Sequence, residues 1–226
     1  MIIDQYRFPA SGGGGGGTPS LIAHTIKGSN GSSVTTNAID TTGANFIVLV
    51  LSSGNGGTAA TISDSNSNTW TSLTVYADLF RSIAICYCYA PTVGSGHTFT
   101  GSLAGKNSMA VAAFDNIASS PFDVENGNVG TTFGTNTPLP TGSVTPSQAN
   151  SLLIAGLMVD DGNGADISID SDFTISDSLK GSAVEGGGPS CALAYKILTS
   201  SAVTNPSWTL SSNPAVADAA IAAFKY

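Results

Sequence analysis

The sequence contains one long pattern twice, and this internal repeat limits the folds that the chain can adopt. Residues 44–114 start with Ala-Asn and an apolar run, continue through an Asp/Asn/Ser-rich turn and an apolar Cys/Tyr segment, and end in Ala-Ala-Phe. Residues 149–224 show the same landmarks in the same order, 105 residues later at the start and 110 later at the end. This period is too long for a solenoid or a propeller blade. We therefore expect two copies of about four strands each, which form two interleaved halves of one β-sandwich.

Composition favours a single folded domain. The chain has 226 residues, of which 41% are hydrophobic and 10% are charged. This is enough apolar material for a core and too little charge for a disordered chain. We expect an all-β, jelly-roll-like sandwich over residues 21–226. The formal net charge of −8 and the scattered Lys and Arg residues argue against a nucleic-acid-binding surface.

The sequence predicts a protein made in a reducing cytoplasm, without membrane insertion. Residues 1–9 lack the basic and apolar stretches of a secretory signal. The longest apolar run, Phe46–Leu51, has the length of a strand and not of a membrane-spanning helix. Cys86, Cys88 and Cys191 are odd in number and lie in apolar strand patterns, which favours buried free thiols over a disulfide or a metal site.

Residues 1–10 are interpreted as a docking peptide, and residues 11–20 as a glycine-rich linker. The apolar side chains of the peptide are Ile2, Ile3, Tyr6 and Phe8. Consecutive glycines have no side chains to bury and a high entropic cost of folding, so they serve as flexible tethers. The alternative is an N-terminal edge strand and loop of the same domain. We favour an anchor on another protein. Such an anchor needs either several docked side chains or multivalent assembly, and we expect a homo-oligomer, with a homotrimer as the specific prediction.

Beyond residue 20 the pattern is one of strands and turns. The apolar run Phe46–Leu51 predicts a strand buried on both faces. Residues 61–73 indicate a hairpin with its tip at Asp64–Asn68, and Thr141–Pro146 indicates a short strand. The Ala-rich segment Ala215–Phe224 has the composition of a helix, but its match to the end of the first copy favours a strand. The expected equivalences are Phe46–Leu51 with Leu152–Leu157, and Ser108–Phe114 with Ala219–Lys225.

Catalytic patterns are weak, and we expect no enzymatic activity. His24 and His97 have no acidic neighbour in the sequence, and no Gly-x-Ser-x-Gly motif supports a Ser-His-Asp triad, although the members of a triad meet only in space. Glycoside hydrolysis needs two carboxylates. Glu125 and Glu185 are flanked by glycine and polar residues, which is typical of solvated loop acids.

Two polar loops carry oxygen ligands in patterns that calcium sites use. The candidate ligands are Asp64, Asn66 and Asn68 in the first loop, and Asp161, Asn163 and Asp166 in the second. The first loop lacks the closing Glu and the central Gly of an EF-hand. Asp and Asn are also the commonest turn residues, because their side chains bond their own backbone. We therefore favour plain turns, and Ca²⁺ is the one cofactor candidate.

Trp70 and Trp208 are candidates for a surface that stacks on sugar rings. Both tryptophans lie in strand patterns. Packing in the core or at a sheet edge is therefore the favoured interpretation, and a carbohydrate platform is the alternative.

Several short motifs resemble a known group of proteins. They are Thr61–Thr71 with Trp70, Gly96–Thr100, Val111–Phe114 and Ser120–Asp123 in the first copy, and Ser151–Leu157, Phe173–Ile175, Ala192–Lys196 and Ala220–Phe224 in the second. Together they resemble β-sandwich modules of tailed-bacteriophage virion proteins and related bacterial surface proteins. The resemblance covers residues 21–226 and describes strands and turns. It implies a fold and a context, and it transfers no site residue.

These observations lead to one expected function and two alternatives. We expect an accessory structural protein of a tailed-phage virion: a head fibre, decoration protein or tail fibre. It would dock on other virion proteins through its N-terminus and display loops toward the host surface, where a glycan is a candidate partner. The first alternative is a carbohydrate-binding module. The second is a polysaccharide hydrolase, which would need an acidic pair about 5 to 10 Å apart in a cleft.

Overall fold

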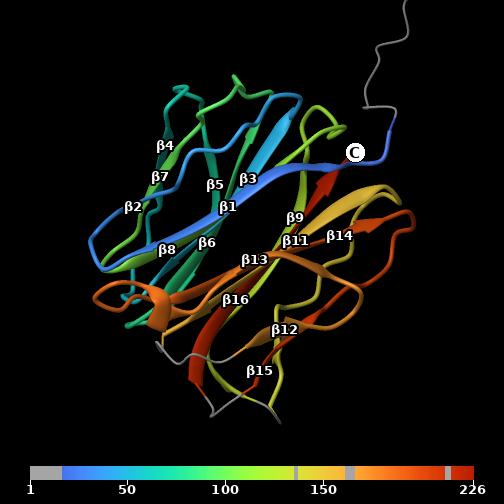
Figure 1. Cartoon of the computed structure of the whole chain (residues 1–226). Helices are drawn as coiled ribbons and strands as arrows, with labels where there is room; N and C mark the ends of the chain where they lie inside the picture. Colours follow the sequence, from blue (N-terminus) through green and yellow to red (C-terminus); the bar gives the residue numbers. More distant parts are fainter. Residues whose placement is uncertain (1–16, 135–136, 161–165, 212–214) are drawn as a thin grey trace, which may run out of the picture.

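The computed structural model describes residues 17–134, 137–160, 166–211 and 215–226. Their regular structure is β-strand apart from one short 3-10 helix, η1, at Gly181–Ala183 (Figure 1). This confirms the all-β class expected from the sequence. In the described part of the chain, no helix has the length and apolarity needed to cross a membrane. The four apolar residues of the predicted docking peptide, Ile2, Ile3, Tyr6 and Phe8, lie outside the described residues.

The described strands form two sets of eight with the same order. The first half contains β1 (Leu21–Ser29), β2 (Val34–Thr35), β3 (Phe46–Ser53), β4 (Thr61–Asp64), β5 (Thr71–Ala77), β6 (Ser82–Tyr89), β7 (Phe99–Ser102) and β8 (Asn107–Phe114). The second half contains β9 (Phe122–Phe133), β10 (Leu139–Pro140), β11 (Ser151–Val159), β12 (Ile167–Ile169), β13 (Thr174–Leu179), β14 (Ser190–Leu198), β15 (Ser207–Leu210) and β16 (Ala215–Lys225). The sheets are β1-β8-β3-β6-β5 and β2-β7-β4 in the first half, and β9-β16-β11-β14-β13 and β10-β15-β12 in the second. Each strand of the second half thus takes the place of the strand eight positions before it.

Each half is therefore a complete sandwich of two antiparallel sheets. The expectation of interleaved halves with about four strands each was wrong. The two copies span six strands each, β3–β8 and β11–β16, and the repeat also includes β1, β2, β9 and β10, which lie outside residues 44–114 and 149–224. The burial of β1 alternates, and it has no continuous apolar run to mark it. Within each half the first strand pairs with the eighth, the second with the seventh and the third with the sixth.

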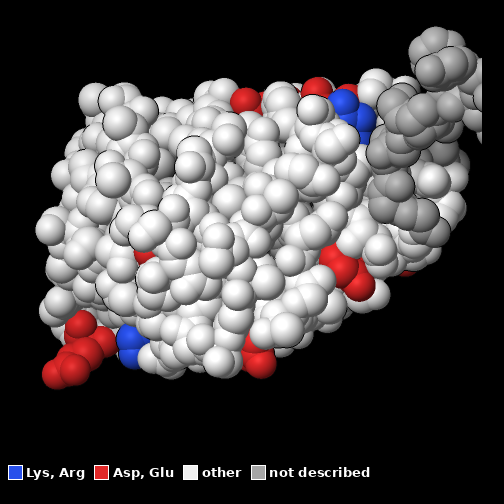
Figure 2. Space-filling model, turned by 90° about the horizontal axis from the view of Figure 1, so that it is seen from above, with Lys and Arg blue, Asp and Glu red and all other residues white. Residues whose placement is uncertain are grey.

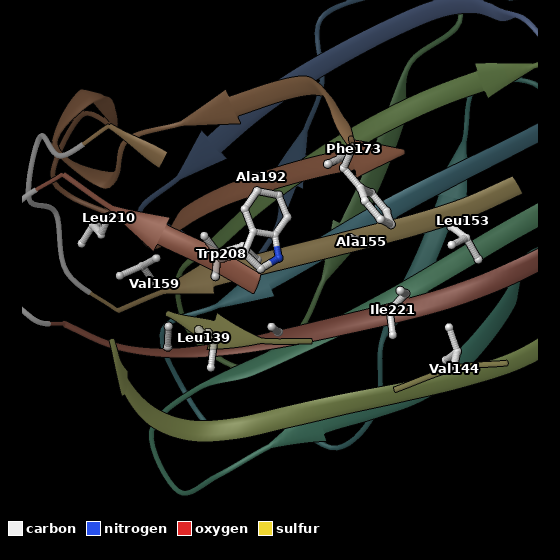
Figure 3. Close-up of a cluster of buried hydrophobic side chains, with 14 of the residues drawn as sticks. Leu139, Val144, Leu153, Ala155, Val159, Phe173, Ala192, Trp208, Leu210 and Ile221 are labelled. Carbon is white, nitrogen blue, oxygen red and sulfur yellow. The ribbon is translucent and has the colours of Figure 1, made fainter. Parts of the chain in front are cut away.

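Three apolar layers hold the molecule together. One fills the first sandwich and one fills the second, where Figure 3 shows Trp208 and Phe173 among the aliphatic side chains. The third lies between the two five-stranded sheets, and we call it the junction. Along β3, Phe46 and Val48 face the junction, whereas Ile47 faces the core of its own sandwich. This explains the continuous apolar run in the sequence, because β3 is buried on both faces, as predicted.

Equivalent aromatic contacts relate the two halves across the junction. The rings of Phe114 and Tyr195 lie 5.3 Å apart, and those of Phe224 and Tyr87 lie 5.2 Å apart. Phe114 pairs with Phe46, and Phe224 pairs with Leu152, so Phe114 and Phe224 are equivalent. The expected match of Phe46 with Leu152 is therefore consistent with the pairing. The expected match of Ser108–Phe114 with Ala219–Lys225 is wrong by one residue.

Other strand predictions have mixed outcomes. Ala215–Phe224 belongs to the strand β16, as expected from the repeat. The hairpin expected over residues 61–73 does not form, because β4 pairs with β7 in the small sheet while β5 pairs with β6 in the large one. The Asp64–Asn68 segment is thus a crossing between two sheets. Thr141–Pro146 is not a strand, and its one ladder contact is an isolated bridge from Val144 to Thr204.

The cysteines confirm the expectation of buried free thiols. Cys86, Cys88 and Cys191 are all buried and unpaired. Burial raises the pKa of Cys86 to about 11, against a smaller lowering by its contact with Ser72. Burial likewise raises the pKa of Cys191, in the junction, to about 12. These thiols are therefore protonated at neutral pH and serve as small apolar core residues.

Candidate functional site

The Asp64 carboxylate accepts hydrogen bonds from several groups of the first predicted calcium loop. Its Oδ2 accepts a hydrogen bond of 2.6 Å from Trp70 Nε1. Its Oδ1 accepts backbone N–H groups from Asn66 at 2.8 Å and Asn68 at 3.3 Å, and Asn68 Nδ2 at 3.2 Å. Burial raises the pKa of Asp64, but these hydrogen bonds outweigh it and hold the pKa below its usual value. The ionised carboxylate is therefore fully engaged in fixing the turn.

This geometry agrees with the favoured interpretation of Asp64, Asn66 and Asn68 as turn residues, and calcium binding at this loop stays a prediction that the structure does not test. The Asp64 side chain is completely buried and faces donors on both oxygens. The amides of Asn66 and Asn68 donate to Thr92 O, and Asn68 Oδ1 accepts the N–H of Thr92 at 2.6 Å. Within the described residues, no group of three or more His, Cys, Asp or Glu side chains has an arrangement that would hold a metal ion. The loop is a turn that connects β4 to β5, and its hydrogen bonds to Thr92 hold it against the segment before β7.

The second predicted calcium loop is only partly described. Asp161 and Asn163 lie outside the described residues, so the structure does not test them. Asp166 is described, and its Oδ1 lies 2.8 Å from Lys180 Nζ on a solvent-exposed side chain. This residue therefore pairs with a lysine across the surface of the second half.

The two candidate sugar-binding tryptophans do not form a platform. Trp208 is 0% exposed in the core of the second sandwich (Figure 3), which excludes the carbohydrate alternative for this residue. Trp70 is partly buried, donates to Asp64, and packs edge-on against Phe99 with ring centres 6.0 Å apart. The favoured interpretation of core packing is correct for both.

A buried Asp-His-Thr arrangement lies behind the Asp64 loop. His97 Nε2 is 3.2 Å from Asp64 Oδ1, outside hydrogen-bond geometry, and His97 Nδ1 is 3.0 Å from Thr41 Oγ1. The succession of carboxylate, imidazole and hydroxyl resembles that of a catalytic triad. However, His97 and Thr41 are 0% exposed, and Thr41 Oγ1 also bonds the backbone of Gly94. No substrate reaches this hydroxyl, so the arrangement connects the loops of the first half.

The other candidate catalytic groups are dispersed. His24 Nδ1 lies 2.9 Å from Asp177 Oδ2, a contact that spans 153 residues and that no sequence motif indicates. Glu125 accepts hydrogen bonds from the N–H and hydroxyl of Thr74, between β9 and β5. Glu185 lies beyond η1, next to β1 on the opposite edge of the paired sheets. The two glutamates therefore do not form the acidic pair that a hydrolase needs.

A cluster of charged residues around Arg81 lies at the β5–β9 edge of the junction. Arg81 pairs with Asp78, and its Nη1 lies 3.2 Å from Asp160 Oδ2 of the second half. Asp218 of β16 is 0% exposed, accepts the N–H of Gly130 at 2.8 Å, and leaves its Oδ2 without a hydrogen-bond partner among the described residues. Burial is the main cause that raises the pKa of Asp218 to about 6, and the charges of Asp78 and Asp160 add to it. The cluster joins the halves electrostatically.

This cluster predicts a pH-dependent stability. The folded pKa of Asp218, about 6, lies above the unfolded value of 3.8, so the folded protein holds this proton more tightly. Protonated Asp218 therefore contributes to the free energy of unfolding. This contribution is complete below the unfolded pKa of 3.8 and is lost as the pH rises through about 6. Asp218→Asn removes the ionisation, and we expect it to stabilise the protein by about 3 kcal/mol at pH 8 and by little near pH 4. Urea unfolding at both pH values measures this. Equal effects at both would contradict it.

The two ends of the paired sandwiches differ. We call the end where the described chain begins the proximal end, and the opposite end the distal end. At the proximal end, the start of β1 lies near the C-terminus (Figure 1). Residues 17–21 meet residues 114–118 there, since Asn116 Nδ2 donates to Thr18 O, and Ala118 N–H donates to Lys225 O. The distal end is formed by residues 28–31, 54–57, 78–81, 104–106 and 185–189. There, Leu79 and Phe80 at the tip of the β5–β6 hairpin are 82% and 63% exposed.

Comparison of the chain with family models, with curated proteins and with solved structures found no match.

Proposed function

We propose that this chain is an accessory display protein of a tailed-bacteriophage particle, such as a head fibre, decoration protein or tail fibre. The N-terminal peptide docks on other virion proteins, and the paired sandwiches present their distal end outward. The resemblance of the strand and turn motifs to virion β-sandwich modules supports the context. The geometry supports the display role.

The main support for this proposal is the difference between the proximal and distal ends of the molecule. The described chain begins at the proximal end, where Ser20 N–H bonds Asp115 Oδ1 at 2.6 Å. A tether that leaves from this point directs the distal loops away from an anchor. The exposed side chains of Leu79 and Phe80 are then available for a contact. Exposed apolar side chains of this size are common at protein interaction sites.

The surface agrees with a structural role. Figure 2 shows a face on which charged groups are sparse and scattered, as expected from a chain with 10% charged residues. Each half is packed around its own apolar core and shares the apolar junction with the other half. Among the described candidate catalytic groups, His97 is buried and Glu125 and Glu185 lie at opposite edges of the paired sheets. These features favour display over hydrolysis.

Deletion of residues 1–17 tests the proposal. We expect a truncated protein that is folded but absent from density-gradient-purified particles, because the apolar peptide supplies the attachment. Each docked apolar side chain contributes roughly 1.5 to 3 kcal/mol before entropic costs. The matched control is the full chain with Ile2, Ile3, Tyr6 and Phe8 replaced by Ser, which should fold and also be lost from particles. Truncated protein that unfolds, or that still joins particles, contradicts the anchor.

A further inference from the structure

A groove at one edge of the junction is a candidate binding site. It lies between β1 of the first half and the β13–η1 segment of the second, and its volume is about 860 Å³. Ile26 of β1 and Leu179 and Val184 of the second half contribute its apolar surface. The volume falls within the range of small-molecule sites. The groove is therefore large enough for a ligand of several linked rings.

The groove is not a simple consequence of the repeat. At the other edge of the junction, the equivalent connection between β5 and β6 is residues 78–81, where Arg81 pairs with Asp78 and contacts Asp160 of the other half. At the groove edge, the connection between β13 and β14 is the longer segment 180–189, with η1 and three consecutive glycines. Gly28 lets this segment approach, because a Cβ there would lie 2.4 Å from Val184 Cγ2. The insertion builds the wall of the groove.

Four solvent-exposed polar residues from both halves line the groove. They are Lys27, Asn30, Asn37 and Glu185. Across the described ranges, none of these four makes a hydrogen bond or an ion pair. By contrast, Asn45, Asn107 and Asn126 each use their amides to bond the backbone. The groove residues therefore keep donors and acceptors for a ligand.

The chemistry of this set selects a neutral saccharide. Two amides, one carboxylate and one ammonium provide both donors and acceptors, and a sugar hydroxyl both donates and accepts. One positive and one negative charge balance, so the groove has no basic cluster for phosphate or nucleic acid. The apolar patches are small, which suits the C–H faces of sugar rings and not a large apolar ligand.

We propose that the groove between β1 and η1 binds a neutral oligosaccharide of a cell surface. This assignment rests on the display function, since it names what the displayed module contacts. Lys27, Asn30, Asn37 and Glu185 bond the hydroxyls, and Ile26, Leu179 and Val184 pack against the rings. No cation takes part.

Binding is tested with the purified full chain, which separates this proposal from particle attachment. The probes are maltotriose, cellotriose and tri-N-acetylchitotriose, each titrated by calorimetry and printed on an array beside polygalacturonate as an acidic control. We expect at least one neutral probe to bind with a millimolar or tighter Kd, unchanged by EDTA. The double variant Asn37→Ala/Glu185→Gln should weaken that binding at least tenfold, and its melting temperature should match the wild type.

Asp172→Asn is the matched control, because this carboxylate is 96% exposed in the β12–β13 turn and does not line the groove. It should bind like the wild type. Failure of all three neutral probes, preference for polygalacturonate, or wild-type affinity in the double variant overturns the assignment. Because particle attachment is measured separately, none of these results bears on the docking peptide.

Discussion

Arg81→Met should destabilise the protein by about 3 to 5 kcal/mol at neutral pH, as removal of one partner from a buried ion pair does. Arg81 is 8% exposed and is the cation that lies among Asp78, Asp160 and Asp218. Methionine keeps much of the side-chain volume but leaves three carboxylates close together, one of them fully buried. Urea unfolding at pH 7 measures the loss. It should shrink near pH 4, where Asp218, whose pKa burial raises to about 6, is protonated.

Asp160→Asn is the control for this prediction. Its side chain is 44% exposed and contributes one contact of 3.2 Å to Arg81. Exposed ion pairs contribute about 0 to 1 kcal/mol, so the control should stay within that range. Arg81→Met with the stability of Asp160→Asn would show that the cluster does not hold the two halves together.

Asp64→Ala should destabilise the protein by about 3 kcal/mol, because it leaves several buried donors without an acceptor. Trp70 Nε1 and the backbone N–H groups of Asn66 and Asn68 all bond this carboxylate. Thermal or urea unfolding measures the loss. Tryptophan fluorescence should also change, since the indole of Trp70 loses its 2.6 Å hydrogen bond.

Two controls separate the structural role of Asp64 from metal binding. Asp40→Ala removes an exposed turn acid that bonds Thr42 N–H at 3.0 Å, and it should change the unfolding midpoint far less. Addition of Ca²⁺ or EDTA to the wild type should leave the midpoint unchanged. A Ca²⁺-dependent rise that disappears in Asp64→Ala would support the calcium interpretation.

The sequence by itself determined the fold class and the most buried strands. β3 and β11 sit between two apolar layers, so every residue along them is buried, and a continuous apolar run is the local signature of that position. The repeat also identified Ala215–Lys225 as a strand despite its helical composition. Burial of the thiols followed in the same way, because Cys86 and Cys191 lie within such runs.

Only the tertiary structure decided which strands share a sheet and which polar groups meet. β4 and β5 are adjacent in sequence but join different sheets, since pairing depends on distant partners and not on the turn between them. The same holds for the candidate sites. Asp64 meets His97, Arg81 meets Asp160, and β1 meets the η1 segment only after the halves fold and pack. The pattern of apolar residues is a local property of the sequence, whereas contacts between polar side chains arise from the packing of distant strands.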